Sequence, residues 1–479
     1  MSEIDTKVEE IIRDELRKID PSINMLGSAR DPQRTIYWIH TNKMPKIHIY
    51  VSWNLHDDLR DCKNFQSSYG KELIERLHRT LLEQVRPTYG PELHNPYISK
   101  LIANRFKSLK SLNIKLPRFC AFAGPNNAGK SNIIDIFRFI FDRTGKGLSW
   151  AMSCRGGMEE VFWKGKEKDT LDITLEVEAS DDSDDNEKQW KWIYEIEILS
   201  GKAPDIKKEL LTLHSDQEER IALEATETVL KIYNSQSDKG FNPISPIVIE
   251  WLHTLGMNEF NLGFHFARYV QNWGIYQFAP QAMKQEAPAI VEPILQGLGD
   301  NLVGRLYTMR GNFPKVFSKI EDILRRYFSV NELLLIPTSD GKVVMKWSES
   351  PYQTPISYVN MPDGALKFIA LLCLIYDPSP PPLMIFEEIE NFLHPGLIDL
   401  VMDEMRETSQ RCQILLTTHS PVVLNCLKPE DVFLVEKGRE RGETHSWRIE
   451  DIEDLRKLAQ DPELRLGDLH QGGHLRRAF

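Results

Sequence analysis

The chain has 479 residues, of which 41% are hydrophobic and 27% are charged, and its formal net charge is −11. This is the composition of an ordinary globular protein, long enough for one large domain or two to three smaller ones. The negative net charge excludes a chain that coats nucleic acid through bulk positive charge, although it leaves room for a local basic groove.

Compartment and membrane association follow from two further features. The N-terminus is polar and acidic, and the longest apolar run, residues 368–376, is far too short to span a bilayer. The six cysteines never form a CxxC pair, so we expect reduced core thiols rather than zinc ligands or disulfides. These features predict a cytoplasmic protein with no membrane partner.

Residues 1–95 are predicted to form a small α+β accessory module, separate from residues 96–479. Apolar residues at helical spacing predict helices within 4–19 and 73–85. Alternating residues predict two hairpin strands, 35–39 and 46–51. The module could dock a partner, contact nucleic acid or cap the fold, and the sequence leaves its role open.

The most specific motif lies between a predicted strand and a predicted helix. A hairpin over 97–116 precedes the apolar strand 118–123, and residues 132–139 continue as a helix. Between them the chain reads GPNNAGKS, which matches the GxxxxGK[ST] pattern of a phosphate-binding loop in the strand–loop–helix context that it requires. A glycine turn that merely joins strand to helix is the alternative, and it would not need lysine and serine at these offsets.

This loop predicts that the chain binds a nucleoside triphosphate. Its glycines let successive N–H groups point at one anion, and the helix N-terminus adds its positive dipole end. Lys130 can reach the terminal phosphates, and the Ser131 hydroxyl can ligate magnesium. The residues predicted to contact the nucleotide here are Gly124, Asn126, Asn127, Ala128, Gly129, Lys130, Ser131 and Asn132.

After the loop the pattern changes twice. Alternation between 171 and 233 predicts an antiparallel meander, and apolar spacing from 251 to 328 predicts helices. Residues 200–350 are therefore expected to contain meander strands and a helical insertion. An acidic loop at 181–185 could hold a metal ion, but a solvated turn is the favoured interpretation.

Two buried strands in the C-terminal half end in polar residues. Strand 382–386 is followed by Glu387 and Glu388, and strand 413–418 by His419. An acid at the carboxyl end of a parallel strand beside a phosphate loop can hold magnesium, and a second acid can orient the attacking water. We predict these two roles for Glu387 and Glu388, and contact with the γ-phosphate or the water for His419. Taken alone, each strand could equally end at exposed acids or at a structural histidine.

In order and spacing these elements resemble the ABC/SMC-type ATPases, specifically the RecF-like and OLD-like branch of bacterial genome maintenance and phage defence. The resemblance covers residues 97–479 and implies an α/β fold: a P-loop head with a mainly parallel sheet, an antiparallel β subdomain and a helical insertion. It identifies the loop as Walker A. The later motifs are then the signature turn at 361–365, Walker B at 383–388, the D-loop at 390–395 and the switch histidine His419.

The resemblance also implies ATP and Mg²⁺ as cofactors and a head-to-head homodimer or higher oligomer. In such a dimer Asp363 and Gly364 would face the nucleotide of the partner subunit. The chain departs from the family pattern in three places. Pro362 stands where a serine is usual, and Glu387 replaces the usual aspartate, which suggests a water-mediated magnesium contact. No glutamine can be assigned to the Q-loop, although Arg155–Glu160 stands in its neighbourhood.

The function expected from the resemblance is a regulatory ATPase that controls a protein effector or engages DNA, in anti-phage defence or DNA repair. No Toprim nuclease is expected after His419, and residues 466–469 look like the tail of ATPase-only relatives. The first alternative is an ATP-gated scaffold with little hydrolysis, because the signature lacks its serine. The second is a transporter ATPase subunit, which the long Walker spacing disfavours. Basic residues over 100–115 could touch DNA, but a solvated strand face is favoured.

Overall fold

The computed structural model describes residues 10–14, 24–30, 34–40, 47–52, 94–164, 170–181, 188–201, 205–215, 219–226, 230–232, 262–438, 442–459 and 464–475. The chain divides into two compact units. Residues 1–92, 233–240 and 251–265 form the first unit, and the remaining residues form the second. Among the described helices, none is long and apolar enough to cross a membrane.

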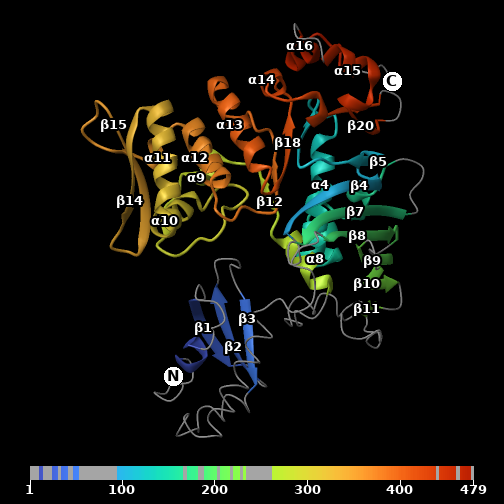
Figure 1. The fold of residues 1–479 in the computed structure, drawn as a ribbon, viewed down its shortest axis with the longest axis horizontal. Coiled ribbons are helices and arrows are strands. Elements are labelled where there is room, and N and C mark those ends of the chain that lie inside the picture. Colours follow the sequence, from blue (N-terminus) through green and yellow to red (C-terminus); the bar gives the residue numbers. More distant parts are fainter. Residues whose placement is uncertain are drawn as a thin grey trace. The chain divides into compact units, whose positions relative to one another are not determined.

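The first unit contains a three-stranded antiparallel sheet (Figure 1). Its strands, in spatial order, are β1 (Asn24–Arg30), β2 (Arg34–His40) and β3 (Ile47–Ser52). The strands β2 and β3 correspond to the predicted hairpin, whereas β1 was not predicted. Residues 10–14 are helical, within the first predicted helix, and the helix predicted over 73–85 lies outside the described residues.

A six-stranded sheet in the second unit carries the phosphate-binding loop. Its order is β12 (Gly274–Tyr276), β17 (Leu383–Phe386), β18 (Gln413–Thr418), β6 (Phe119–Ala123), β19 (Val432–Lys437) and β20 (Thr444–Arg448). The first five strands are parallel and β20 is antiparallel to β19. Every residue of β6, β17 and β18 is buried, as expected for parallel strands that are covered on both faces. The expected α/β head with a mainly parallel sheet is confirmed.

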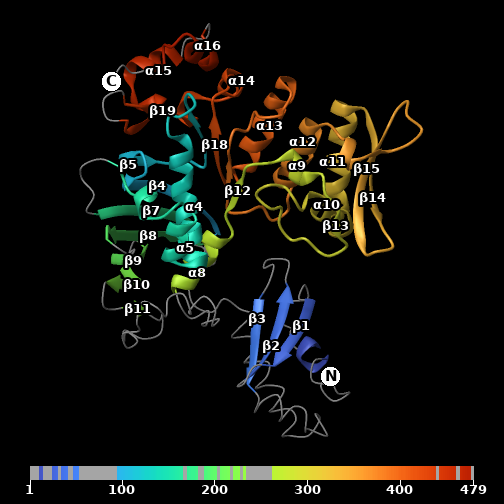
Figure 2. The ribbon, with the colours of Figure 1, turned by 180° about the vertical axis from the view of Figure 1, so that it is seen from behind.

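A second, antiparallel sheet packs beside the helix that follows the loop, α4 (Lys130–Lys146), as the two opposite views show (Figures 1 and 2). Its order is β11 (Leu230–Ile232), β10 (Glu219–Thr226), β9 (Asp205–Ser215), β8 (Lys188–Leu199), β7 (Thr170–Asp181), β4 (His94–Phe106) and β5 (Leu109–Lys115). The predicted hairpin and meander are both present. A buried ion pair of 2.6 Å between Arg143 of α4 and Glu209 of β9 ties helix to sheet, and Tyr194 donates a 2.6 Å hydrogen bond to the same carboxylate.

Most of the other described helices pack on α4, on one another or on a small antiparallel sheet. They are α5 (Leu148–Ser153), α6 (Met158–Val161), α8 (Leu262–Gln271), α9 (Pro280–Met283), α10 (Leu302–Asn312), α11 (Pro314–Phe328), α12 (Asp363–Ile375), α13 (Pro395–Thr408), α14 (Pro421–Asn425), α15 (Glu453–Ala459) and α16 (Leu466–Gln471). The small sheet has the order β13 (Ala287–Pro288), β15 (Lys342–Glu349) and β14 (Val330–Pro337), and β16 (Ile356–Ser357) also pairs with β15.

The stretch predicted as helical from 251 to 328 is helical only in part. It contains α8 to α11, but it also contains β12 and β13, which are three and two residues long. Strands of this length show no alternation, so a pattern search cannot detect them. The helix α11 follows the rules closely: Pro314 occupies its first turn, Ser329 ends it in a left-handed conformation, and Phe317, Ile320 and Leu324 are buried on its apolar face.

Candidate functional site

The loop between β6 and α4 has the backbone of an anion cradle. Asn127 and Gly129 adopt left-handed conformations, with φ values of 67° and 106°. In the described part of the chain, no acceptor takes the N–H groups of Asn127, Gly129, Lys130 or Ser131. Bare N–H groups at a helix N-terminus are the arrangement that binds phosphate. The loop therefore fits a triphosphate.

Hydrogen bonds from neighbouring side chains support this loop. A Cβ atom on Gly129 would lie 2.0 Å from Oγ1 of Thr444, so only glycine fits there. The Thr444 hydroxyl donates to the Ala128 carbonyl at 3.0 Å and lies 2.7 Å from Oγ of Ser108. Asn132 in turn donates to Ser108 over 2.5 Å. The predicted contact residue Asn132 thus braces the loop through the β4–β5 turn and β20.

Lys130 is folded onto its own loop. Its Nζ donates to the carbonyls of Gly124 and Pro125 at 2.7 and 2.9 Å, and the residue is buried. Burial lowers the pKa of Lys130, while the carboxylates of Glu388 and Glu390 oppose that shift. The ammonium group therefore lies within electrostatic range of the acids that follow β17.

Hydrogen bonds join the acidic segment after β17 to the end of β18. The N–H of Glu388 donates to Oγ1 of Thr417 at 2.9 Å. Oε1 of Glu390 accepts from the N–H of His419 at 2.9 Å and lies 3.1 Å from its Nδ1. Lys130, Glu388 and His419, which are distant in sequence, thus meet at the carboxyl edge of the sheet. From the sequence, Glu390 was placed only in the D-loop at 390–395, and its contact with His419 was not predicted.

The backbone of Glu388 is strained. Its φ of 47° lies in the left-handed region, which costs a non-glycine residue on the order of 1–3 kcal/mol. Asn391 donates to the Glu388 carboxylate at 2.5 Å from within the same turn. Such strain persists only where the surroundings over-determine the conformation, and it concentrates at functional sites.

Glu387 is held differently from the role predicted for it. Its carboxylate forms an ion pair with Arg138 of α4, and its N–H donates to the Tyr276 carbonyl at 3.0 Å. Ser131, the other predicted magnesium ligand, is exposed at the start of α4, and within the described residues no hydrogen bond or ion pair joins it to Glu387. Seven residues separate Ser131 from Arg138, which corresponds to about 10 Å along a helix. The water-mediated magnesium contact predicted for Glu387 stays a prediction.

Gln277 is a candidate site residue that the sequence analysis missed. It follows β12 directly, and Tyr276 of β12 is in register with Phe386 of β17. Gln277 therefore stands at the same edge as Glu387, and it lines a hollow of about 300 Å³ with Arg138 and Asp300. Its amide oxygen is a suitable magnesium ligand. The only signal was an apolar pair before a glutamine in a stretch that otherwise reads as helical.

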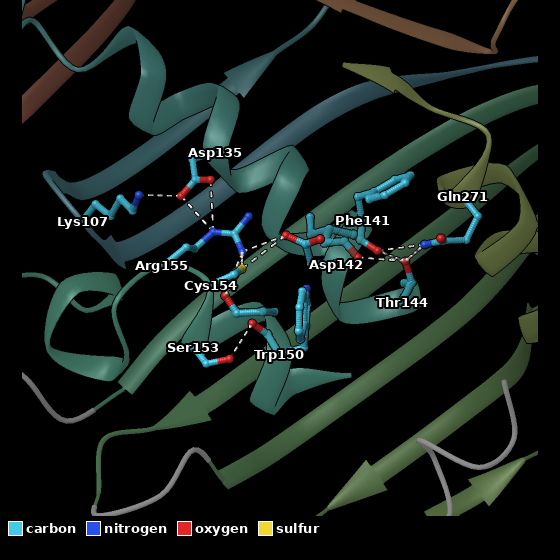
Figure 3. A network of polar contacts seen from close by, with 12 residues as sticks. Lys107, Asp135, Phe141, Asp142, Thr144, Trp150, Ser153, Cys154, Arg155 and Gln271 are labelled. Carbon is cyan, nitrogen blue, oxygen red and sulfur yellow. Dashed lines mark hydrogen bonds and ion pairs between the residues drawn. The ribbon is translucent and has the colours of Figure 1, made fainter. Parts of the chain in front are cut away.

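The stretch Arg155–Glu160 serves a different purpose from a Q-loop. Figure 3 shows Arg155 between two acids of α4. Its Nε donates to both carboxylate oxygens of Asp135, at 3.1 and 3.0 Å, and its Nη1 to Asp142 at 2.9 Å. Lys107 reaches Asp135 from the β4–β5 turn at 2.6 Å. These contacts anchor the flank of α4.

The signature turn begins α12. Pro362 is the N-cap, and Asp363 forms a 2.7 Å ion pair with Lys284. A Cβ atom on Gly364 would lie 2.4 Å from the carbonyl oxygen of Phe392, so α12 packs directly on the turn that follows Glu388. In the part of the chain that the structure describes, no hydrogen bond or ion pair joins Asp363 or Gly364 to the loop at 124–131. Their predicted contact with a partner's nucleotide remains a prediction.

The acidic loop at 181–185, for which a solvated turn was favoured over a metal site, remains untested. Most of the acidic loop at 181–185 lies outside the described residues. Within the described part of the chain, no group of three or more His, Cys, Asp or Glu side chains could hold a metal ion.

Comparisons with known proteins agree with this geometry. A family model described as "AAA domain, putative AbiEii toxin, Type IV TA system" matches residues 119–425. An Escherichia coli protein named "Retron Ec83 probable ATPase" is 24% identical over 176 residues, which are 30% of this chain and 32% of that protein. "Chromosome partition protein Smc" of Methanocaldococcus jannaschii is 33% identical over 79 residues, 16% of this chain and 7% of that protein.

The chain spans about a third of the length of the first of these relatives and less than a tenth of the second. A solved structure described as "Crystal structure of the SmcHead bound to the C-winged helix domain of ScpA" is 17% identical, with a TM-score of 0.45. It covers 74% of this chain and 98% of that chain.

Proposed function

The chain belongs to the family of AAA ATPase domains whose model matches residues 119–425, and on this basis we propose that it binds and hydrolyses ATP as an ABC-type head. One observation carries the proposal. Lys130 lies within electrostatic range of Glu388 and Glu390, and His419 is hydrogen-bonded to Glu390, all beside a loop whose N–H groups are bare. A phosphate-binding loop, an acid and a histidine at one edge of a parallel sheet support hydrolysis of a triphosphate.

Each part has a distinct task in this proposal. The N–H groups of Asn127, Gly129, Lys130 and Ser131 hold the phosphates. The Lys130 ammonium group exchanges its contacts with two loop carbonyls for phosphate oxygens. Ser131 would hold magnesium directly, and Glu387 through water; the metal supplies neutralisation of phosphate charge. Glu388 orients the attacking water, and His419, held by Glu390, contacts the γ-phosphate.

We further propose a head-to-head homodimer or higher oligomer, in which the first turn of α12 faces the nucleotide of the partner subunit. The bare start of α12 supports this, because Pro362 is the N-cap and the first backbone bonds run from Ala365 and Leu366 to its carbonyl. The ion pair from Lys284 neutralises Asp363, which would otherwise repel a phosphate. The assembly would control a cytoplasmic protein effector or engage DNA, in anti-phage defence or DNA repair.

A scaffold that holds ATP with little hydrolysis is the second candidate. Pro362 favours it, because a proline N-cap offers neither a hydroxyl nor an N–H to an opposing γ-phosphate. Steady-state phosphate release with and without DNA separates the two candidates, since a scaffold would bind ATP tightly and release almost no phosphate.

The active-site assignment is tested with two variants and one control. Lys130→Met should lose ATP binding, whereas Glu388→Gln should keep ATP binding and lose on the order of 10²–10⁴-fold in phosphate release. Glu159→Gln changes an exposed acid of α6 and should behave as wild type. Unchanged turnover in both site variants would overturn the assignment. Light scattering of Glu388→Gln with ATP and Mg²⁺ then tests the dimer, since a monomer at saturating ATP contradicts it.

A further inference from the structure

The helix α12 carries one buried charge that its packing does not require. The helix reads DGALKFIALLCLI, so Lys367 is its only cation, and every residue from 365 to 375 is buried. Burying an ammonium group is costly unless it is well paired. An apolar residue would fill this position at lower cost, so the contacts of Lys367 call for an explanation.

The ammonium group of Lys367 is directed at the main chain of Glu388. Its Nζ donates to the Glu388 carbonyl at 3.1 Å, and the N–H of Asn391 donates to the same oxygen at 3.0 Å. The Glu388 N–H is held by Thr417 and its carboxylate by Asn391. Each polar group of this residue therefore has a donor or an acceptor, and α12 supplies one of them. These bonds help to hold the left-handed backbone of Glu388.

The electrostatics of Lys367 also link it to Glu388. Burial lowers the pKa of Lys367 to about 8, and the carboxylates of Glu390 and Glu388 oppose that shift. Lys130 feels the same two carboxylates from the phosphate-binding loop. The acids thus lie within range of two lysines. If Lys130 moves to bind phosphate, Lys367 remains near the carboxylates of Glu388 and Glu390.

A second contact links α12 to this turn. Gly364, in the first turn of α12, packs so closely on the Phe392 carbonyl that a methyl group would not fit. Lys367 lies three residues further along, about one helical turn, and holds the Glu388 end of the same turn. A displacement at the start of α12 must therefore move the segment 388–392.

We propose that Lys367 is a positioning residue, which fixes Glu388 through its main-chain carbonyl and couples the placement of that acid to the first turn of α12. The inference rests on the proposed function, in which Glu388 orients the attacking water. It adds a route by which occupation of the α12 turn by a partner's nucleotide changes hydrolysis in the same subunit.

The test compares two substitutions with a matched control in the full-length protein. Lys367→Met removes the bond to Glu388, and Lys367→Arg keeps a donor. Thr408→Val removes a buried hydroxyl of α13, which donates to the Glu404 carbonyl at 2.8 Å and lies 3.3 Å from the Ile375 carbonyl at the opposite end of α12. For each protein we would measure the Kd for ATP, the single-turnover hydrolysis rate at saturating ATP and Mg²⁺, and the Tm.

Lys367→Met should bind ATP with a Kd within about threefold of wild type, because the loop is untouched, yet hydrolyse up to about 100-fold more slowly, since a shift of about 1 Å in a catalytic group can cost that much. Lys367→Arg should recover most of the rate. Thr408→Val should lower Tm and leave the rate unchanged. If Lys367→Met hydrolyses ATP as fast as Thr408→Val does, the inference about Lys367 is overturned, while the proposed function stands. A wild-type protein that binds ATP without hydrolysing it overturns the proposed function, and this inference with it.

Discussion

Replacing Gly364 by alanine adds one methyl group at a position where helix propensity and packing favour opposite outcomes. Gly364 is the second residue of α12, and alanine in a helix is favoured over glycine by up to about 1 kcal/mol. Its backbone has an ordinary helical φ, so no conformational strain opposes the change. Propensity alone therefore predicts a more stable protein.

Packing predicts the reverse. The new Cβ atom would lie 2.4 Å from the Phe392 carbonyl oxygen, whereas ordinary contact begins at 3.4 Å, so the two backbones must separate by 3.4 − 2.4 = 1.0 Å. Overpacking of this kind costs about 1–3 kcal/mol, so that after a propensity gain of about 1 kcal/mol the net loss is up to about 2 kcal/mol. Because the segment 388–392 must move, hydrolysis should fall by more than ATP affinity does, by up to about 100-fold.

Gly311 provides the control. It lies within α10 and a Cβ atom added there would meet nothing within 4 Å, so Gly311→Ala should stabilise the protein by up to about 1 kcal/mol. Thermal and denaturant unfolding of both variants, with single-turnover hydrolysis, measures the contrast. If Gly364→Ala raised Tm as Gly311→Ala does and kept the wild-type rate, the contact between α12 and the Glu388 turn would not constrain the site.

Three further expectations concern the surroundings of the site. Arg143→Met should destabilise the second unit by about 3–5 kcal/mol, because it leaves Glu209 buried without its cation. Adding Glu209→Leu should restore most of the lost stability, as measured by denaturant titration. A double variant less stable than Arg143→Met would contradict this expectation. Thr444→Val should weaken ATP binding severalfold and lower the free energy of unfolding by about 1–3 kcal/mol, since the Ala128 carbonyl loses a buried donor. Calorimetry measures both quantities, and an ATP affinity equal to that of wild type would contradict the expectation. Lys367 has a folded pKa of about 8 against 10.5 in the unfolded chain, so the unfolded state binds more protons between these values and stability rises with pH there. The free energy of unfolding of wild type relative to Lys367→Met should therefore increase from pH 8 to 10.5, and a constant difference would refute the argument.

The parts of the site that sequence predicts are those whose geometry is local. The loop needs glycines, lysine and serine at fixed offsets within eight residues, and in the structure a left-handed Gly129 directly precedes α4. Buried strands that end in polar residues were also visible, because β17 and β18 are continuous apolar runs. From these runs alone, Lys130, Glu388 and His419 could be expected at one edge of the sheet.

What sequence could not predict depends on partners far along the chain. Arg138 binds Glu387 across 249 positions and Ser108 meets Thr444 across 336, and neither pair has a spacing signal. Gln277 was missed because β12 is only three residues long. The β14–β15 hairpin was missed because the predicted helical stretch ends at Phe328 and no strands were predicted after it. The burial of Lys367 was also not predicted, since a single lysine in an apolar helix is normally expected at the surface.

The polar residues of α4 explain why these long-range pairs matter to the site. Its first residue, Lys130, belongs to the loop, whereas Asp135 binds Arg155, Arg138 binds Glu387 and Arg143 binds Glu209. Successive turns of one helix are thus tied to the α5–α6 segment, to the end of β17 and to the antiparallel sheet. Because packed interiors resist small shifts, a displacement of α4 at its N-terminus should also be felt at the contacts further along the helix. If the loop binds phosphate as proposed, we therefore expect the placement of Glu387 to respond through its ion pair with Arg138.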